Sequence, residues 1–395
     1  MDKLLRATLK HGLMPPVVME LPGITVGGGI QGAGAESSSF KHGCFNANCN
    51  WYEMILGDGQ IVKASPTQHE DLFYGTAGAY GSLGVLTAVE MQLIPAKKYV
   101  NVSYRPVDSF EDAVKTLTQL STEDYDFIDG IMFAAGKGVI IYGKLSNTAS
   151  GKSARFSRAH DNWFYLHAAK KIRAGVETTE SIPLADYLFR YDRGAFWTGQ
   201  YTFERAHYPF SRFTRWLLNP MLSARKLYQA LQETNAAQQY VVQDVVLPRR
   251  EAASYLNFLD GLFGQYPLWL CPLKPDDKSP LLCNNVQTDL AINIGVWLGK
   301  RVESDKEFVA INRQIEAELQ RCGGKKWLYA QSYYPEAEFW KIYGKDWYTK
   351  LRKKYHAEHL PDVYQKVIST RQPVKSIKRA AIKTAFGLSK LRIKD

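Results

Sequence analysis

The sequence predicts an α+β fold, built as one large domain or two ordinary ones. The chain has 395 residues and is 45% hydrophobic, which is enough for a sizeable core. Several apolar stretches alternate as strands do, for example 289–297, and others repeat at helical spacing, for example 302–321. No GxxxxGK[ST] motif occurs, and no GxGxxG lies between a strand and a helix. These observations disfavour a nucleotide-binding βαβ fold.

Two glycine-rich stretches organise the chain. The first, Ile24–Gly43, has six glycines in twenty positions. Glycine inside a helix or strand costs roughly 0.5–1 kcal/mol relative to Ala, so we expect loops here. The second, within Asp71–Pro95, is a glycine-punctuated turn, Gly75–Gly84, that leads into a strand, Val85–Ile94. Together they predict two walls of one site for a large, flat, phosphate-bearing ligand; tight turns are the alternative.

The remaining elements follow from local patterns. Met1–Leu13 reads as an amphipathic helix, and Gly57-Asp58-Gly59 is typical of a β-hairpin turn between two apolar runs. Gly323-Gly324 is expected to close the helix at 302–321. Other strands are expected at 100–105, 127–133, 138–144, 239–247, 268–271, 289–297 and 327–334, and other helices at 109–120 and 336–355.

The net charge of +11 favours an anionic partner or simple solubility. The C-terminal residues 374–395 have an apolar stripe and seven Lys or Arg, which predicts either a membrane-binding amphipathic tail or a frayed soluble end. No stretch is long and apolar enough to span a membrane, and no signal peptide is evident.

Five scattered cysteines argue against a disulfide scaffold and suit a reducing compartment. No metal-binding constellation is present, and Cys44 is expected to be an ordinary buried thiol.

An aromatic and basic segment spans residues 156–231. Such a mixture occurs in single-strand nucleic-acid binding, at membrane interfaces, and in an ordinary core with a cationic surface. The residues alone favour the ordinary core.

Several strings carry a resemblance to a known family. TVGGGIQGAGAESSSFKHG, YEMILGDGQIV and DLFYGTAGAYGSLGVLTAVEMQLIPAKKYV resemble the PCMH-type FAD-binding domain of the vanillyl-alcohol-oxidase superfamily. VVQDVVLP, YPLWLCPL and EAEFW are similar to the delta(24)-sterol reductase family, and the resemblance extends to about Val367. It implies the second half of a two-subdomain FAD domain at 1–98, an α+β substrate cap at 99–325, a return to the FAD domain at 326–370, and a basic tail at 371–395. The first subdomain and a membrane anchor would be missing, so we expect FAD to bind weakly or not at all.

The resemblance also implies an activity. Enzymes of this family reduce the delta(24) double bond of a sterol side chain in sterol biosynthesis, with FAD as cofactor and NADPH as reductant. The implied partners are the sterol and the cytosolic face of the endoplasmic reticulum membrane, with no nucleic acid. The aromatic segment then becomes a sterol-facing, membrane-proximal cap. The alternatives are an alcohol or sugar oxidase of the same superfamily, or a non-catalytic truncated membrane-surface protein.

Site residues follow from the same resemblance. An isolated alkene needs a well-placed acid in a dry site, because no carbonyl polarises it. The acid candidates include Asp244, Lys326 and Tyr333, and we favour Tyr329 and Glu36 as neighbours of the reactive ring. Asp244 is unusual in an apolar strand, but we expect a solvent-facing position for it. The expected cofactor-binding residues are Gly27, Gly28, Gly29, Gly32, Gly34, Ser37, Ser38, His42, Gly43, Gly78, Gly81, Gly84 and Val85.

Overall fold

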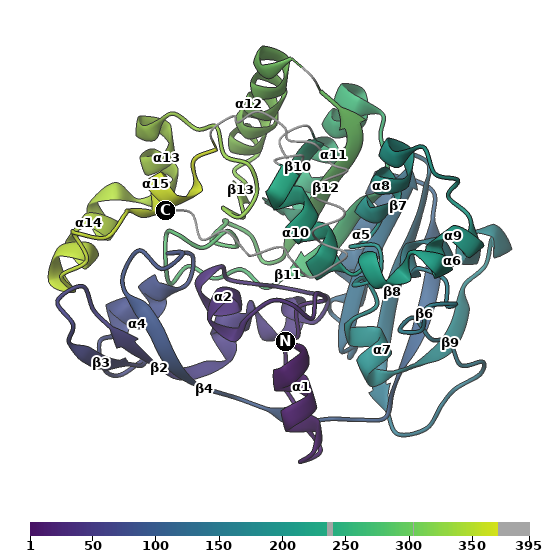
Figure 1. Ribbon diagram of the computed structural model, residues 1–395, viewed down its shortest axis with the longest axis horizontal. Helices are drawn as coiled ribbons and strands as arrows, with labels where there is room; N and C mark the ends of the chain where they lie inside the picture. The colour runs from purple at the N-terminus through teal and green to yellow at the C-terminus, as the bar shows by residue number, and fades with distance from the viewer. Residues whose placement is uncertain (235–239, 303, 370–395) are drawn as a thin grey trace.

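A large antiparallel sheet dominates the computed structural model, which describes residues 1–234, 240–302 and 304–369 (Figure 1). Eight strands run in the order β13-β10-β12-β11-β7-β8-β6-β9, and every pairing is antiparallel. The mixture of helices with an antiparallel sheet confirms the predicted α+β class. The strands are β6 (Tyr99–Val107), β7 (Phe127–Ala134), β8 (Lys137–Ser146), β9 (Thr178–Pro183), β10 (Tyr240–Pro248), β11 (Leu268–Leu273), β12 (Ala291–Arg301) and β13 (Lys325–Lys326).

Both faces of the sheet are buried. Successive side chains of a strand point to these two faces in turn. On β11, Leu268 and Leu270 join one apolar core, whereas Trp269 and Cys271 join another. Three helices cover the first face: α5 (Phe110–Leu120), α11 (Arg249–Phe263) and α12 (Asp305–Arg321). The aromatic segment and parts of the N-terminal region cover the second face, so the polar residues on this face are enclosed.

The aromatic segment is mostly an ordinary core. Trp163, Tyr165 and Trp197 are at most 4% exposed and pack together on the second face. The expected membrane-proximal position therefore does not hold for these three rings, whereas Phe213 and Trp216 stand on the surface. The helices of this segment are α6 (Phe164–Lys171), η2 (Ile172–Ala174), α7 (Leu184–Leu188), α8 (Thr198–Ala206), α9 (Arg212–Leu217), η3 (Asn219–Met221) and α10 (Ala224–Thr234).

The N-terminal region has a small sheet of its own, in the order β3-β2-β4. The predicted hairpin is confirmed, since Ile55 of β2 pairs with Ile61 of β3 around the Gly-Asp-Gly turn. β1 pairs with β5 in a separate two-stranded sheet. The elements are α1 (Asp2–Leu9), β1 (Leu13–Met14), α2 (Val26–Gln31), α3 (Ser39–His42), η1 (Phe45–Asn48), β2 (Cys49–Ile55), β3 (Ile61–Ala64), α4 (Glu70–Thr76), β4 (Val85–Met91) and β5 (Ile94–Pro95).

Three C-terminal helices pack against this N-terminal region (Figure 1). The hydroxyl of Tyr348 donates to Ser82 Oγ at 2.7 Å, and Arg352 Nη1 donates to the Ser82 carbonyl at 3.0 Å. The chain thus returns to its own beginning after the large sheet, while the proposed domain boundaries stay predictions. The helices are α13 (Glu336–Tyr343), α14 (Lys345–Lys354) and α15 (Val363–Val367).

The first glycine-rich stretch is not a loop throughout, because residues 26–31 form the helix α2. Thr25 caps this helix by accepting a hydrogen bond from the Gly28 amide at 3.0 Å. A Cβ at Gly29 would lie 2.3 Å from Met19 Cε, and one at Gly34 would lie 3.0 Å from Met19 Sδ. These two glycines allow close packing, a use that outweighs the low helix propensity of glycine.

Three other expectations need correction. Residues 327–334 do not form a strand: β13 ends at Lys326, a turn follows, and Ser332 makes only an isolated bridge to Ile368. The helix expected at 336–355 is two helices, which break at Gly344 with its φ of +73°. The N-terminal helix ends at Leu9, because the chain turns at Gly12 into β1.

None of the described helices combines the length and apolarity that crossing a bilayer requires. The predicted amphipathic tail, 371–395, lies outside the described residues. All five cysteines are free and buried.

Candidate active site

The second face of the large sheet holds a row of polar and aromatic side chains at its centre. Gly295 of β12 pairs with Asp244 of β10 on one side and with Trp269 of β11 on the other. A Cβ at Gly295 would lie 2.6 Å from the ring of Trp297, so the missing side chain makes room for this ring. The N-terminal region lies over this part of the sheet and encloses it.

Asp244 is the most unusual member of this row. Its side chain is 6% exposed, so the expected solvent-facing position is wrong; β10 lies between two neighbours and both of its faces are covered. Tyr329 donates its hydroxyl to Asp244 Oδ2 at 2.6 Å, and Asn293 Nδ2 donates to Oδ1. Burial raises the pKa of Asp244 to about 7, and the hydrogen bonds from Tyr329 and Asn293 only partly oppose this shift.

Tyr329 connects this buried acid to the surface. It lies in the turn after β13, and its residue is 55% exposed although its hydroxyl is bonded to the enclosed carboxyl. Burial of the hydroxyl end, followed by the charge of Asp244, raises the pKa of Tyr329 well above its usual value. The pair therefore presents an acid that holds a proton near neutral pH next to an accessible aromatic ring, an arrangement suited to general acid catalysis.

The turn that holds Tyr329 is fixed by both glycine-rich stretches. Trp327 Nε1 donates to the Ala33 carbonyl at 3.0 Å, and Tyr80 lies against the backbone of Leu328 and Tyr329. Residues remote in sequence thus set the position of the Tyr329 hydroxyl.

Glu36 belongs to a different network. It is buried, accepts from the Ser37 hydroxyl at 2.6 Å and from the Ser38 amide at 2.9 Å, and burial raises its pKa. Ser37 in turn accepts from Arg190 at 3.3 Å. In the described part of the chain, no hydrogen bond or ion pair joins Glu36 to Tyr329, so these two favoured residues are held in separate clusters.

Arg190 is the centre of this second network, and sequence reasoning missed it. Its Nη2 forms an ion pair of 2.8 Å with Asp129 Oδ2, and both side chains are fully buried. The same oxygen accepts from Tyr191 at 2.8 Å and from Trp269 Nε1 at 3.1 Å. An acid inside the apolar run FIDGIMF was the available signal. Asn293 was missed as well, although it too interrupts an apolar strand.

The two glycine-rich stretches do lie side by side, because the amides of Gly78 and Tyr80 donate to the Gln31 carbonyl at 2.9 and 3.4 Å. Within the first stretch, the amide of Gly32 donates to Gly28 and that of Gly34 to Gly29. These N–H groups are therefore engaged within the chain and are not directed at a phosphate.

Space around several of the predicted glycines is also filled by protein. A Cβ at Gly78 would lie 2.6 Å from the Leu281 carbonyl oxygen, and one at Gly84 would lie 2.6 Å from that of Ile55. A Cβ at Gly81 would lie 3.0 Å from Gln31 Oε1, and one at Gly27 would lie 3.7 Å from Leu86. As arranged here, these residues do not fit a phosphate cradle, so we assign them no phosphate contact; their role in cofactor binding remains a prediction.

The other predicted cofactor neighbours differ in their surroundings. The hydroxyl of Ser38 donates to the Pro16 carbonyl at 2.7 Å, and the backbone carbonyl of His42 accepts from Asn48 at 3.1 Å. Gly43 ends α3 with a φ of +71°. Val85 is 62% exposed at the start of β4.

Lys326 and Tyr333 serve a structural network. Lys326 Nζ forms a fully buried ion pair of 2.7 Å with Glu316, and the Tyr333 amide donates to the same carboxylate at 2.9 Å. Arg313 binds the other oxygen of Glu316 at 2.7 Å. This network joins α12 to β13 and to the turn beyond it, so we do not place the Lys326 ammonium in the active site. Tyr333 contributes its backbone amide, and the role of its hydroxyl stays a prediction.

Comparison with known proteins decides the family. The chain is 33% identical over 360 residues to the Delta(24)-sterol reductase of Homo sapiens, a match that spans 89% of this chain and 69% of that protein. The chain belongs to the delta(24)-sterol reductase family. It is also 27% identical to the Delta(24)-sterol reductase homolog dhcr-24 of Caenorhabditis elegans, over 93% of this chain and 73% of the homolog. Delta(24)-sterol reductase of Arabidopsis thaliana is 28% identical, over 98% of this chain and 75% of that protein.

A shorter match of 34% identity over 140 residues links this family member to Cytokinin dehydrogenase 4 of rice, over 34% of this chain and 26% of that protein. No family model matches the chain. The similarity to the sterol reductase family that VVQDVVLP, YPLWLCPL and EAEFW indicated is thus confirmed.

Proposed function

We propose that this chain reduces the delta(24) double bond of a sterol side chain, and that Asp244 and Tyr329 form its acid centre. Family membership supports the substrate class. The single observation that carries the assignment of the centre is a buried carboxyl whose pKa is raised to about 7 and which is bonded to an accessible tyrosine.

The chemistry asks for one proton and one hydride. Protonation of the less substituted alkene carbon, C24, places tertiary cationic character on C25, where hydride arrives. Asp244 holds a proton up to about pH 7 and lies among apolar and aromatic side chains that exclude water. Tyr329 donates its hydroxyl to Oδ2 and connects the carboxyl to the accessible side. Asn293 fixes the carboxyl plane, since its Nδ2 donates to Asp244 Oδ1 and also to the Val245 carbonyl at 2.9 Å.

The hydride requires a redox cofactor, and we propose FAD, reduced by NADPH. FAD, when bound, supplies hydride transfer in the resembled superfamily. The glycine-rich stretches do not fit the phosphate part of FAD as arranged here, so no step is derived through it. We further propose the PCMH-type subdomain division given above. We also propose that the protein acts at the cytosolic surface of the endoplasmic reticulum membrane, because a sterol substrate is dissolved in lipid.

The test uses the purified full chain with FAD in large excess, because weak FAD binding is expected, together with NADPH and a delta(24) sterol held in cyclodextrin. We expect the saturated sterol as product, detected by mass spectrometry. Asp244→Asn removes the proton donor at nearly constant shape, and we expect the rate to fall about 10²–10⁴-fold. The matched control is Asp289→Asn, because Asp289 is an acid near the start of β12 with a 70% exposed side chain. Absence of product in the wild type, or full activity of Asp244→Asn, would contradict the proposal.

A further inference from the structure

One helix of the aromatic segment carries its apolar side chains outward. α9 (Arg212–Leu217) has no buried residue. Phe213, Trp216 and Leu217 are 65%, 49% and 58% exposed and lie at positions i, i+3 and i+4, which share one face of a helix. Tyr208, just before the helix, is 60% exposed. We call these four residues the α9 surface.

The α9 surface is held in place by the protein beneath it. Ser211 and Thr214 form a reciprocal capping box at the start of the helix. The guanidinium of Arg215 lies 4.7 Å from the ring centroid of Phe210, which packs against the buried Trp163. Arg212 Nη2 donates to the His160 carbonyl at 3.2 Å and ties the helix to the preceding loop. The rings are therefore presented by an ordered element, which limits the entropy lost when they bind.

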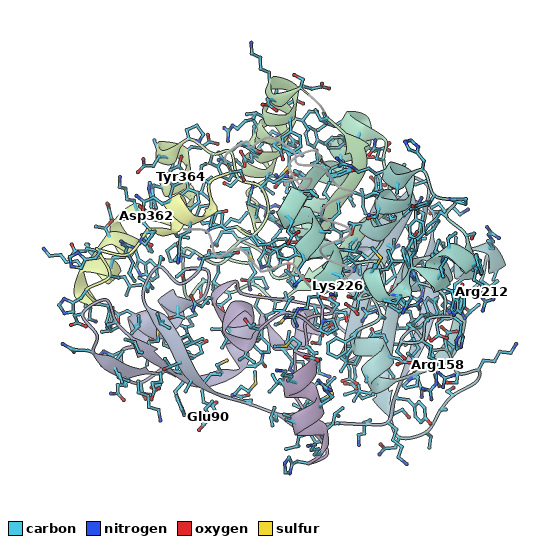
Figure 2. All side chains as sticks on the ribbon, in the orientation of Figure 1. Glu90, Arg158, Arg212, Lys226, Asp362 and Tyr364 are labelled. Atoms are coloured by element: carbon cyan, nitrogen blue, oxygen red, sulfur yellow. The ribbon has the colours of Figure 1, made fainter. Side chains whose placement is uncertain are left out.

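The positive charge around the α9 surface indicates an anionic partner. Residues 205–228 contain five Lys or Arg and no Asp or Glu. Arg155 and Arg158 are exposed in the neighbouring loop, and Figure 2 shows Arg158 and Arg212 along the same edge of the molecule. Half-exposed aromatic rings among cations match the interface of an anionic bilayer, where rings enter the headgroup layer and cations meet lipid phosphates.

We infer that the α9 surface inserts into the headgroup layer of an anionic membrane. This inference rests on the membrane part of the proposed function and deepens it by naming the contact. The insertion would seat the substrate cap on the bilayer that contains the sterol. It is independent of the tail at 371–395, which is retained in every form tested below.

The experiment measures co-sedimentation of the full chain with vesicles of phosphatidylcholine alone or with added phosphatidylserine. The test variant changes Phe213, Trp216 and Leu217 to Ser; because all three are exposed, the fold is expected to be unchanged. The control is Ile61→Ser, since Ile61 is 66% exposed on β3, far from α9 (Figure 1). We expect the triple variant to lose at least tenfold in partitioning onto anionic vesicles, and the control to bind as the wild type does.

Two further readouts complete the test. Brominated lipid should quench emission of the wild type more than that of Trp216→Phe. Arg158→Gln with Arg212→Gln should weaken binding to anionic vesicles and leave binding to neutral vesicles unchanged. Equal binding by the triple variant and the wild type would overturn the inference. Loss of a dimer by the triple variant, with no vesicle binding by the wild type, would overturn it too and assign the surface to a second copy.

Activity separates this inference from the proposed function. With sterol in cyclodextrin, the triple variant should be as active as the wild type; with sterol in vesicles, it should be slower. If neither form reduces the sterol in cyclodextrin, the proposed function fails, whereas the sedimentation result still decides the role of the α9 surface.

Discussion

Asp129 and Asp244 lie on the same face of the large sheet and are both buried, yet their surroundings differ. Asp129 forms an ion pair with Arg190 and accepts two further hydrogen bonds at the paired oxygen. Asp244 accepts from a hydroxyl and an amide, and no ion pair is found for it among the described residues. The guanidinium of Arg190 lies 2.8 Å from the first carboxyl, whereas burial favours a proton on the second.

The difference separates a structural acid from a reactive one. The Asp129–Arg190 pair joins β7 to the segment after α7 and, through Ser37, to the stretch that precedes α3. Neither hydrogen-bond partner of Asp244 carries a positive charge, so burial raises its pKa and the carboxyl holds a proton near neutral pH that it can donate. Each variant below is expected to change the behaviour of one of these two acids and to leave the other acid unaffected.

The largest effect is expected from breaking the charged pair. Arg190→Met leaves Asp129 buried without its cation, and we expect the free energy of unfolding to fall by about 3–5 kcal/mol. Denaturant unfolding at pH 7 measures this loss of stability. The control is Arg249→Met, which breaks a pair with Asp289 whose side chains are 43% and 70% exposed, and we expect a loss of at most about 1 kcal/mol. Similar losses in both variants would contradict the assignment.

The sequence predicted much of this architecture and less of the site. The hairpin at Gly57-Asp58-Gly59 and the helix that ends before Gly323 depend on local signals and are confirmed. Asp244 was misplaced because a strand covered on both faces has no polar side to reveal its orientation. The turn around Tyr329 was predicted as a strand because its position depends on contacts such as Trp327 to Ala33, which no local pattern contains.

The second prediction concerns stability and pH. The pKa of Asp244 is about 7 in the folded protein against an ordinary value of 3.8, so the folded state binds more protons between these values and stability falls as pH rises through them. Between pH 5 and 8 this contributes a loss of about 2–3 kcal/mol, and the loss levels off above pH 7. In denaturant unfolding at pH 5 and pH 8, Asp244→Asn should not show this pH-dependent loss of stability. An unchanged difference between pH 5 and 8 would show that another group is responsible.

The third and smallest effect is expected at Tyr329. The hydroxyl of Tyr329 lowers the pKa of Asp244 by favouring the carboxylate. Tyr329→Phe should therefore raise this pKa further, and the alkaline limb of the activity profile should move upward by about one pH unit. The pH dependence of kcat/KM measures the shift, and Tyr364→Phe, which removes a hydroxyl from the C-terminal helix α15, is the control. A downward shift would show that the hydroxyl stabilises the protonated acid instead.

The protonation state of Asp244 itself is the most direct test of the account. Infrared difference spectra between the wild type and Asp244→Asn, recorded from pH 5 to 9, isolate the carbonyl stretch of this one protonated carboxyl. The account predicts a band that is present at pH 6 and disappears with a midpoint near 7. A carboxyl that is already ionised at pH 5 would contradict it.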